Sequence, residues 1–247
     1  QYDGTISYTG GIAQNVVINT EIKKRVSNLI IPPHANDCGL SLGIVEFLRK
    51  CYDQEPFDNN GFPFWQDDEA PKDLPTEETI KTTAEMLADG KIVGWYQGHG
   101  EIGPRALGNR SILMDPSIPN GKDILNDKVK EREWYRPFGA SILEEEVSNY
   151  FDWNDKSEYM LYTMDVIEPD RFPAITHVDG TCRTQTVGSS LYYQLISNFK
   201  DLTGIPMVLN TSLNMGGKPI AGTPADAIDL LHASDMDALV IGNRIYE

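Results

Sequence analysis

The chain has 247 residues, with 37 Asp and Glu against 21 Lys and Arg, which gives a formal net charge of −16 and a pI near 4.6. This charge argues against nucleic acid and anionic membrane as general partners, because both are themselves negatively charged. No apolar run approaches the length of a membrane span, and 40% hydrophobic residues suffice for an ordinary globular core.

The cysteines, the histidines and the start of the sequence indicate the redox state of the thiols, the prospects for a metal site and the extent of the protein. Cys38, Cys51 and Cys182 are an odd number at no metal-binding spacing, as expected of reduced thiols in the cytoplasm. The four histidines never fall three or four residues apart, so no complete metal site is predicted. The sequence begins at Gln1, without an initiator methionine, and runs directly into a strand-like segment. We therefore expect a fragment of a longer protein.

The first fifty residues predict two strand–turn–helix units of an α/β fold. Strands are expected at 5–9 and 28–31, and helices at 12–25 and 40–52. About fifty residues are too few to cover both faces of a parallel sheet. Residues 1–52 are therefore expected to be one end of a larger domain, and their uncovered apolar side chains favour a homodimer.

A polar segment separates this part from the rest of the chain. Residues 53–75 are dense in Pro, Gly, Asn and Asp and show no sustained period, which is typical of a linker or an extended arm. Its aromatic residues, such as Phe62 and Trp65, predict that it packs on the rest of the protein. A helix is then well indicated, with Thr76 as its N-cap and Gly90 beyond its end.

Residues 76–247 alternate strand and helix patterns, so a mixed α/β domain is predicted there. The expected strands are 91–97, 140–143, 160–166, 181–187, 206–209 and 237–241. The expected helices after the first are 144–151, 188–203 and 224–233, the last with Pro224 at its first position.

One segment differs in charge from the rest of the chain. Gly94 to Arg136 contains seven Lys and Arg against six Asp and Glu, whereas the remainder has 14 against 31. It also contains closely spaced glycines, which allow backbone N–H groups to approach a ligand. Guanidinium groups suit phosphate and carboxylate oxygens, so we predict a pocket for a small anion. The alternative for each arginine is a solvated surface ion pair.

Three stretches resemble the O-carbamoyltransferase family of nodulation-factor and antibiotic-tailoring enzymes. They are GHGEIGPRALGNRSILMDP with LNDKVKEREWYRPFGASIL, DGTCRTQTV, and IPMVLNTSLNMGGKPIAGTPADA. In that family this part is a YrdC-like domain that converts carbamoyl phosphate and ATP to carbamoyl-adenylate. The resemblance therefore implies a donor-activating domain that uses ATP, Mg²⁺ and carbamoyl phosphate. The final acceptor would be a small molecule, a sugar or a natural-product hydroxyl.

The resemblance also implies the residues of the site. Arg105, Lys130 and Arg136 are expected to hold phosphate and carbamoyl phosphate oxygens as the catalytic cations. Contacts to the nucleotide or the donor are expected from Gly103, Asn109, Arg110, Ser111, Arg183, Asn210, Ser212 and Asn214. The alternatives are a structural ion pair for Arg183 and turn or cap positions for the polar residues. His99, alone among glycines, is interpreted as incidental.

The head of the chain, TGGIAQNVVIN with PPHANDCGLSLG, resembles the end of the family's other domain. That domain has an actin-like ATPase-superfamily fold, transfers the carbamoyl group and carries a divalent metal such as Fe²⁺. Asp37 matches a metal-binding aspartate, and Asn15 matches a position near that domain's nucleotide. The histidine pair of the metal site has no counterpart here, so an incomplete site is expected. The alternative for Asp37 is a helix cap.

Two other functions stay open at this point. A threonylcarbamoyl-adenylate synthase for tRNA modification shares the YrdC-like fold, although the three stretches above favour carbamoyl phosphate. A non-enzymatic RNA-binding or assembly module is the other alternative, and the net charge of −16 weighs against RNA.

Overall fold

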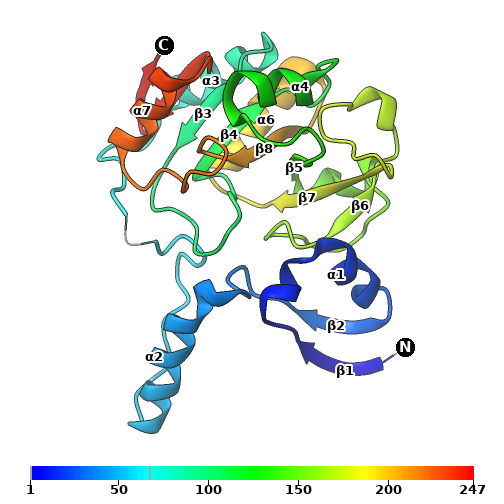
Figure 1. The fold of residues 1–247 in the computed structure, drawn as a ribbon, viewed down its shortest axis with the longest axis vertical. Helices are drawn as coiled ribbons and strands as arrows, with labels where there is room; N and C mark the ends of the chain where they lie inside the picture. Colours follow the sequence, from blue (N-terminus) through cyan, green and yellow to red (C-terminus); the bar gives the residue numbers. More distant parts are fainter. Residues whose placement is uncertain (1, 67) are drawn as a thin grey trace.

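The computed structural model describes residues 2–66 and 68–247. Within them, an eight-stranded sheet has the order β10-β9-β3-β4-β8-β5-β7-β6, and β1 and β2 form a separate parallel pair (Figure 1). In the large sheet the pairs β3–β9 and β5–β7 are parallel, and the other neighbours are antiparallel. The predicted mixed α/β class is confirmed.

The strands and helices of the large sheet's domain have the following bounds. The strands are β3 (Val93–Tyr96), β4 (Arg110–Met114), β5 (Gly139–Leu143), β6 (Thr163–Asp165), β7 (Thr181–Val187), β8 (Met207–Ser212), β9 (Ala238–Ile241) and β10 (Arg244–Tyr246). The helices are α3 (Glu77–Ala88), α4 (Gly121–Leu125), α5 (Val147–Tyr150), α6 (Leu191–Thr203) and α7 (Pro224–Ala233). A π-helical turn, η3 (Asn126–Lys130), continues α4, and short 3₁₀ turns are η4 (Glu144–Glu146) and η5 (Pro169–Arg171).

The best-predicted helices are those whose ends carry explicit signals. Thr76 caps α3 by accepting from the Thr79 N–H. At α7 the Thr223 side chain and Asp226 form a reciprocal capping box around Pro224. At α6, Gly204 in the left-handed conformation ends the helix.

Several predicted boundaries were wrong, and β4, α4 with η3, and β10 were not predicted. Strand β4 is a short apolar run without alternation, buried along its whole length, and such runs carry no periodic signal. Strand β8 continues past 209 through Ser212, whereas β6 is shorter than 160–166. The expected helix 144–151 is a 3₁₀ turn followed by the single turn of α5.

The first part of the chain contains β1 (Tyr2–Ser7), η1 (Gly11–Gln14), α1 (Val16–Lys23) and β2 (Val26–Ile30). The single helix expected over 12–25 was wrong, because Asn15 is extended and caps α1 by accepting from the Ile18 N–H. Helix α1 packs against the β6 edge of the large sheet (Figure 1). There the buried Asn19 Nδ2 donates to the Leu161 carbonyl at 2.9 Å, and the Thr163 N–H donates to Thr20 Oγ1 at 2.9 Å.

Helix α2 (Leu40–Cys51) follows the 3₁₀ turn η2 (Asp37–Gly39) and extends away from the rest of the molecule (Figure 1). None of its residues is buried within the part of the chain that the structure describes, and Leu40, Ile44 and Phe47 are mostly exposed. The assignment of residues 1–52 to a larger domain stays a prediction.

The segment after α2 returns to the large domain and packs there, as its aromatic residues predicted. The Phe62 ring lies 5.5 Å from the His34 ring, 5.0 Å from that of Trp65 and 6.4 Å from that of Tyr159. No helix among residues 2–66 and 68–247 combines the length and apolarity that a membrane crossing requires.

Candidate anion-binding site

The candidate site lies where β5, β7 and β8 meet. In the sheet register Gly139 of β5 is paired with Arg183 on one side and with Asn210 on the other, so both side chains project from the same face. A Cβ at Gly139 would lie 2.7 Å from the Arg183 carbonyl oxygen and 3.4 Å from the Met160 sulfur. Glycine at the central strand therefore leaves room between the arginine and the amide.

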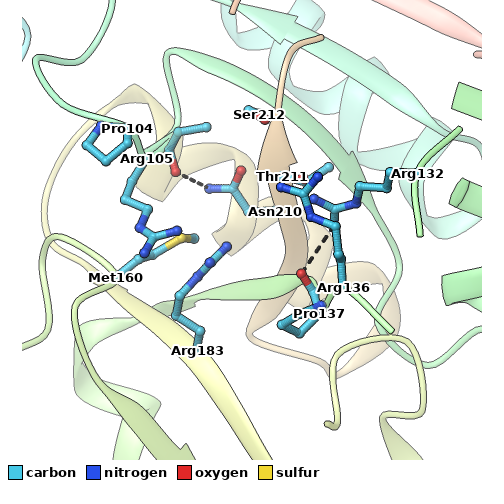
Figure 2. A pocket seen from close by; sticks show the side chains of 11 residues that line it. Pro104, Arg105, Arg132, Arg136, Pro137, Met160, Arg183, Asn210, Thr211 and Ser212 are labelled. Carbon is cyan, nitrogen blue, oxygen red and sulfur yellow. Dashed lines mark hydrogen bonds between the residues drawn. The ribbon is translucent and has the colours of Figure 1, made fainter. Parts of the chain in front are cut away.

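A cavity of about 170 Å³ opens at this place (Figure 2). Its walls are Pro104, Arg105, Ala106, Arg132, Arg136, Pro137, Met160, Arg183, Asn210, Thr211 and Ser212. Four of these residues are arginines, and no aspartate or glutamate is found among the described residues that line it. In Figure 2 the guanidinium groups of Arg105 and Arg183 approach from one side and those of Arg132 and Arg136 from the other.

The cavity arginines are short of counter-charge. Within the described part of the chain the Arg183 guanidinium has no hydrogen-bond partner, and the buried Nε atoms of Arg105, Arg132 and Arg183 are all unpaired. Burial and the nearby charge of Arg105 lower the pKa of Arg183 to about 9. Burial and the charge of Arg136 lower the pKa of Arg132 to about 10. Arg136 pairs with Glu133 at 3.5 Å, but none of the described residues that line the cavity is a carboxylate. Cations gathered in this way are the arrangement of an anion site.

Asn210 adds an acceptor to this set of donors. Its Nδ2 donates to the Ala106 carbonyl at 3.2 Å and to Ser141 Oγ at 2.9 Å, which fixes the orientation of the amide. Its Oδ1 is buried and has no hydrogen-bond partner among the residues that the structure describes. A buried, unpaired carbonyl oxygen is costly, so the cavity fits a ligand that brings an N–H or O–H donor together with its negative charge.

A buried glutamate, which the sequence interpretation missed, organises the loop that presents Arg105. One oxygen of Glu101 accepts from the backbone N–H groups of Leu107 at 2.6 Å, Asn109 at 2.8 Å and Arg110 at 3.4 Å. Burial raises the pKa of Glu101. No signal in the sequence distinguishes this acid, because its partners are backbone groups.

Arg132 was also missed as a site residue. Its guanidinium lies over the Phe138 ring at 4.5 Å and donates to the Pro137 carbonyl at 3.2 Å, which holds it at the cavity wall. The sequence analysis counted Arg132 among the seven cations between Gly94 and Arg136, but nothing in its position distinguished it from the others.

Five of the predicted residues line the cavity: Arg105, Arg136, Arg183, Asn210 and Ser212. Lys130 and Asn214 lie directly behind its wall. Lys130 Nζ donates to the Ser212 carbonyl at 2.8 Å, the Asn214 carbonyl at 2.7 Å and Asn214 Oδ1 at 2.8 Å. Lys130 therefore holds the turn that follows β8 and does not itself face the cavity.

Arg110 does not line the cavity and acts as a structural cation. Its side chain is 1% exposed, and Nη2 lies 2.5 Å from the buried Asp68 carboxylate. Its guanidinium also stacks on the Tyr96 ring at 3.6 Å and donates to the Gln97 carbonyl at 2.7 Å. This network ties the returning segment of the arm to the sheet.

The remaining predicted contacts of the loop also lie outside the cavity. Ser111 Oγ accepts from the Gly108 N–H, and Asn109 Nδ2 donates to the His99 carbonyl. Gly103 packs against the backbone of Pro33, where a Cβ would lie 2.5 Å from the carbonyl oxygen. His99 itself is more than half exposed and lies 3.1 Å from Asp68.

Asn15 and Asp37 lie in the first part of the chain. Asn15 caps α1, and its neighbour Gln14 accepts a hydrogen bond from Arg105 Nη2 at 3.1 Å. Asp37 begins η2. The described residues contain no group of three or more His, Cys, Asp or Glu that could hold a metal ion. The residues present around Asp37 therefore do not suffice for the metal site implied by the resemblance.

Lys130 predicts a pH-dependent stability. Burial and the charges of Arg132 and Arg136 lower the pKa of Lys130 to about 7. In the unfolded chain its pKa is about 10.4, so above pH 7 the unfolded chain binds more protons and the free energy of unfolding rises with pH. We expect this rise between about pH 7 and 9 in urea titrations at constant ionic strength. Lys130→Met should reduce this rise, with Arg183 contributing only toward the upper end of the range, and an equal rise in that variant would contradict the assignment.

Comparison with known proteins shows the family of the chain. The Carbamoyltransferase C-terminus family matches residues 84–247. The chain is 36% identical to nodulation protein NolNO of Sinorhizobium fredii, over 97% of this chain and 39% of that protein. It is 32% identical to the 3′-hydroxymethylcephem-O-carbamoyltransferase of Streptomyces clavuligerus, over 99% of this chain and 49% of that protein.

The fold comparison points in the same direction. Escherichia coli YciO superimposes with a TM-score of 0.52 at 15% identity, over 71% of this chain and 82% of that one, which supports the expected YrdC-like fold. The chain spans less than half the length of the two relatives above. The match over residues 84–247 covers most of the chain, including β4, the arginine cavity and the turn after β8. The chain therefore belongs to the Carbamoyltransferase C-terminus family.

Proposed function

We propose that this chain is the donor-activating part of an O-carbamoyltransferase, which binds carbamoyl phosphate and ATP at the arginine cavity. The observation that carries this proposal is the gathering of four arginines around about 170 Å³ without a lining carboxylate. Two of the relatives bear the name of an O-carbamoyltransferase, which supports a carbamoyl group as the group that is transferred.

Carbamoyl phosphate matches both features of the cavity. Its phosphate oxygens accept from the guanidinium donors of Arg105, Arg183 and their neighbours. Its carbamoyl NH₂ supplies the donor that the buried Asn210 Oδ1 lacks. A cavity of this size suits the small anion, and the larger ATP would reach it with its phosphates from the mouth beside Arg136.

The proposed chemistry needs no side-chain nucleophile. Water cleaves the carbonyl–phosphate linkage of carbamoyl phosphate, which releases inorganic phosphate and leaves carbamate. A carbamate oxygen then attacks the α-phosphorus of ATP, and the α–β bridging bond breaks to release pyrophosphate and carbamoyl-adenylate. The arginines hold the reacting anions together and stabilise the charge that develops on them.

The described residues of this chain supply neither a cluster of metal ligands nor an acceptor in this proposal. Mg²⁺ would arrive with the ATP phosphates, since the described residues offer no cluster of metal ligands. Transfer to a small-molecule hydroxyl, such as a sugar or another natural product, belongs to the whole protein, because the matched relatives are about twice as long as this chain or longer. The three free cysteines support a location of the enzyme in the cytoplasm, where thiols stay reduced.

A pair of nearly isosteric ligands tests the donor assignment. Acetyl phosphate carries a methyl group where carbamoyl phosphate carries NH₂, so it cannot donate to Asn210 Oδ1. Isothermal titration should show acetyl phosphate binding about 5- to 150-fold more weakly, the range for leaving one buried acceptor unpaired. Equal affinity for the two ligands would contradict the proposed role of Asn210, and no binding of either would contradict the proposed function.

The alternatives give different results in the same instrument. A threonylcarbamoyl-adenylate synthase would bind threonine in preference to carbamoyl phosphate. An RNA-binding module would bind RNA with an affinity that falls steeply as salt is added.

A further inference from the structure

A tight turn between two arginines that line the cavity carries two exposed aromatic side chains. The Arg136 N–H donates to the Glu133 carbonyl at 3.1 Å, which closes the turn and places Trp134 and Tyr135 at its tip. Their side chains are 79% and 65% exposed. The two rings stand nearly perpendicular, at 84° and 5.9 Å between centroids.

The same turn supplies cations to the cavity from its two ends. Arg132 and Arg136 bracket the aromatic pair in sequence, and both line the cavity. Consecutive Cα atoms are 3.8 Å apart, so Trp134 and Arg136 are separated by at most about 7 Å along the backbone. One short segment therefore combines phosphate-binding groups with flat apolar surfaces that water covers.

We propose that Trp134 and Tyr135 form the stacking platform for the nucleobase of ATP, whose phosphates lie against Arg132 and Arg136. This inference rests on the proposed function and adds a specific site to it. A nucleotide has an anionic end and a flat aromatic end joined by one ribose, and the turn offers a matching surface to each. Trp134 and Tyr135 meet edge to face, so at least one ring face stays free. A nucleobase could stack on that face in the offset geometry that aromatic pairs favour.

Stacking accounts for the exposure better than a role in folding does. An exposed Trp in a folded protein leaves a large apolar surface in water, and covering that surface is favourable. A nucleobase covers such a ring without needing a matched hydrogen-bond pattern. Binding through this platform should therefore discriminate only weakly between ATP and GTP.

Calorimetry with ATP and with inorganic tripolyphosphate separates the platform from the phosphate site. Loss of one stacked base corresponds to about a 5- to 150-fold drop in affinity. We expect Trp134→Ala to weaken ATP by this factor, and Tyr135→Ala by a smaller one, with tripolyphosphate and carbamoyl phosphate unchanged. Trp134→Phe should retain most of the affinity. Tyr52→Ala, which removes a 74% exposed ring at the end of α2, is the matched control and should bind ATP normally.

Each other outcome overturns the platform. Unchanged ATP affinity in Trp134→Ala, with carbamoyl phosphate and ATP both binding, removes the platform and leaves the proposed function standing. Equal weakening of tripolyphosphate shows that the side chain only supports the loop. A change in sedimentation without any change in ATP binding makes the pair a protein-interaction surface. Failure of the unaltered protein to bind ATP removes both proposals.

Discussion

Replacing Arg183 with Met should stabilise the unliganded protein and weaken its binding of carbamoyl phosphate about 10- to 150-fold. The buried Nε of Arg183 has no hydrogen-bond partner in the described part of the chain, and the charge of Arg105 opposes that of Arg183. Methionine keeps much of the apolar stem without the uncompensated charge, so folding becomes easier. The ligand loses a charged hydrogen bond of about 1.5–3 kcal/mol, a factor of roughly 10 to 150 in affinity.

Opposite signs for stability and binding make this test specific. Differential scanning calorimetry should show a higher melting temperature for Arg183→Met without ligand. Added carbamoyl phosphate should raise the melting temperature of the original protein but not that of the variant. Arg171→Met is the control, because Arg171 is exposed and pairs with Glu168, so both properties should stay unchanged. A destabilised variant that still binds the ligand would contradict the account of the cavity.

Asp68→Ala should destabilise the protein by about 3–5 kcal/mol, the range for leaving one partner of a buried ion pair uncompensated. Arg110 is only 1% exposed and would lose its ion pair with Asp68. The Gly100 N–H would also lose its acceptor, which lies 3.0 Å away. The arm that carries Asp68 should consequently become accessible to proteases.

Urea titration of paired variants checks this estimate. Lys156→Ala breaks an exposed pair with Glu144 and should cost about 1 kcal/mol or less. Combining Asp68→Leu with Arg110→Met removes both charges and should recover part of the stability lost in Asp68→Ala. A cost below about 1 kcal/mol for Asp68→Ala would show that the pair contributes no more than a surface one.

Local signals were enough for much of the fold. The mixed α/β class, the starts of α3 and α7 and the end of α6 followed from caps, prolines and the period of apolar residues. The start of α6 was wrong, because the helix begins at Leu191 and not at 188. Strand β4 was not predicted, because it is buried along its whole length and its sequence does not alternate between polar and apolar residues. The break in the helix at Asn15 was not predicted, because an asparagine is compatible with both a helix interior and an N-cap.

The candidate site shows where sequence reasoning stops. Composition and spacing marked Arg105, Arg110, Arg132 and Arg136 alike as cations of one window. Only the fold distinguishes them. Arg110 pairs with Asp68, which lies 42 residues away in the chain, whereas Arg132 lines the cavity and forms no ion pair with any described carboxylate. Glu101 shows the same limit, because its three partners are backbone N–H groups.

The central claim is that this chain activates carbamoyl phosphate with ATP at the arginine cavity. Mass spectrometry of the purified chain incubated with carbamoyl phosphate, ATP and Mg²⁺ tests it most directly, with Arg183→Met in parallel. We expect carbamoyl-adenylate and pyrophosphate in equal amounts from the original chain, and at least about tenfold less of both from the variant at substrate concentrations below saturation. No carbamoyl-adenylate from the original chain, or equal amounts from both proteins, would contradict the claim.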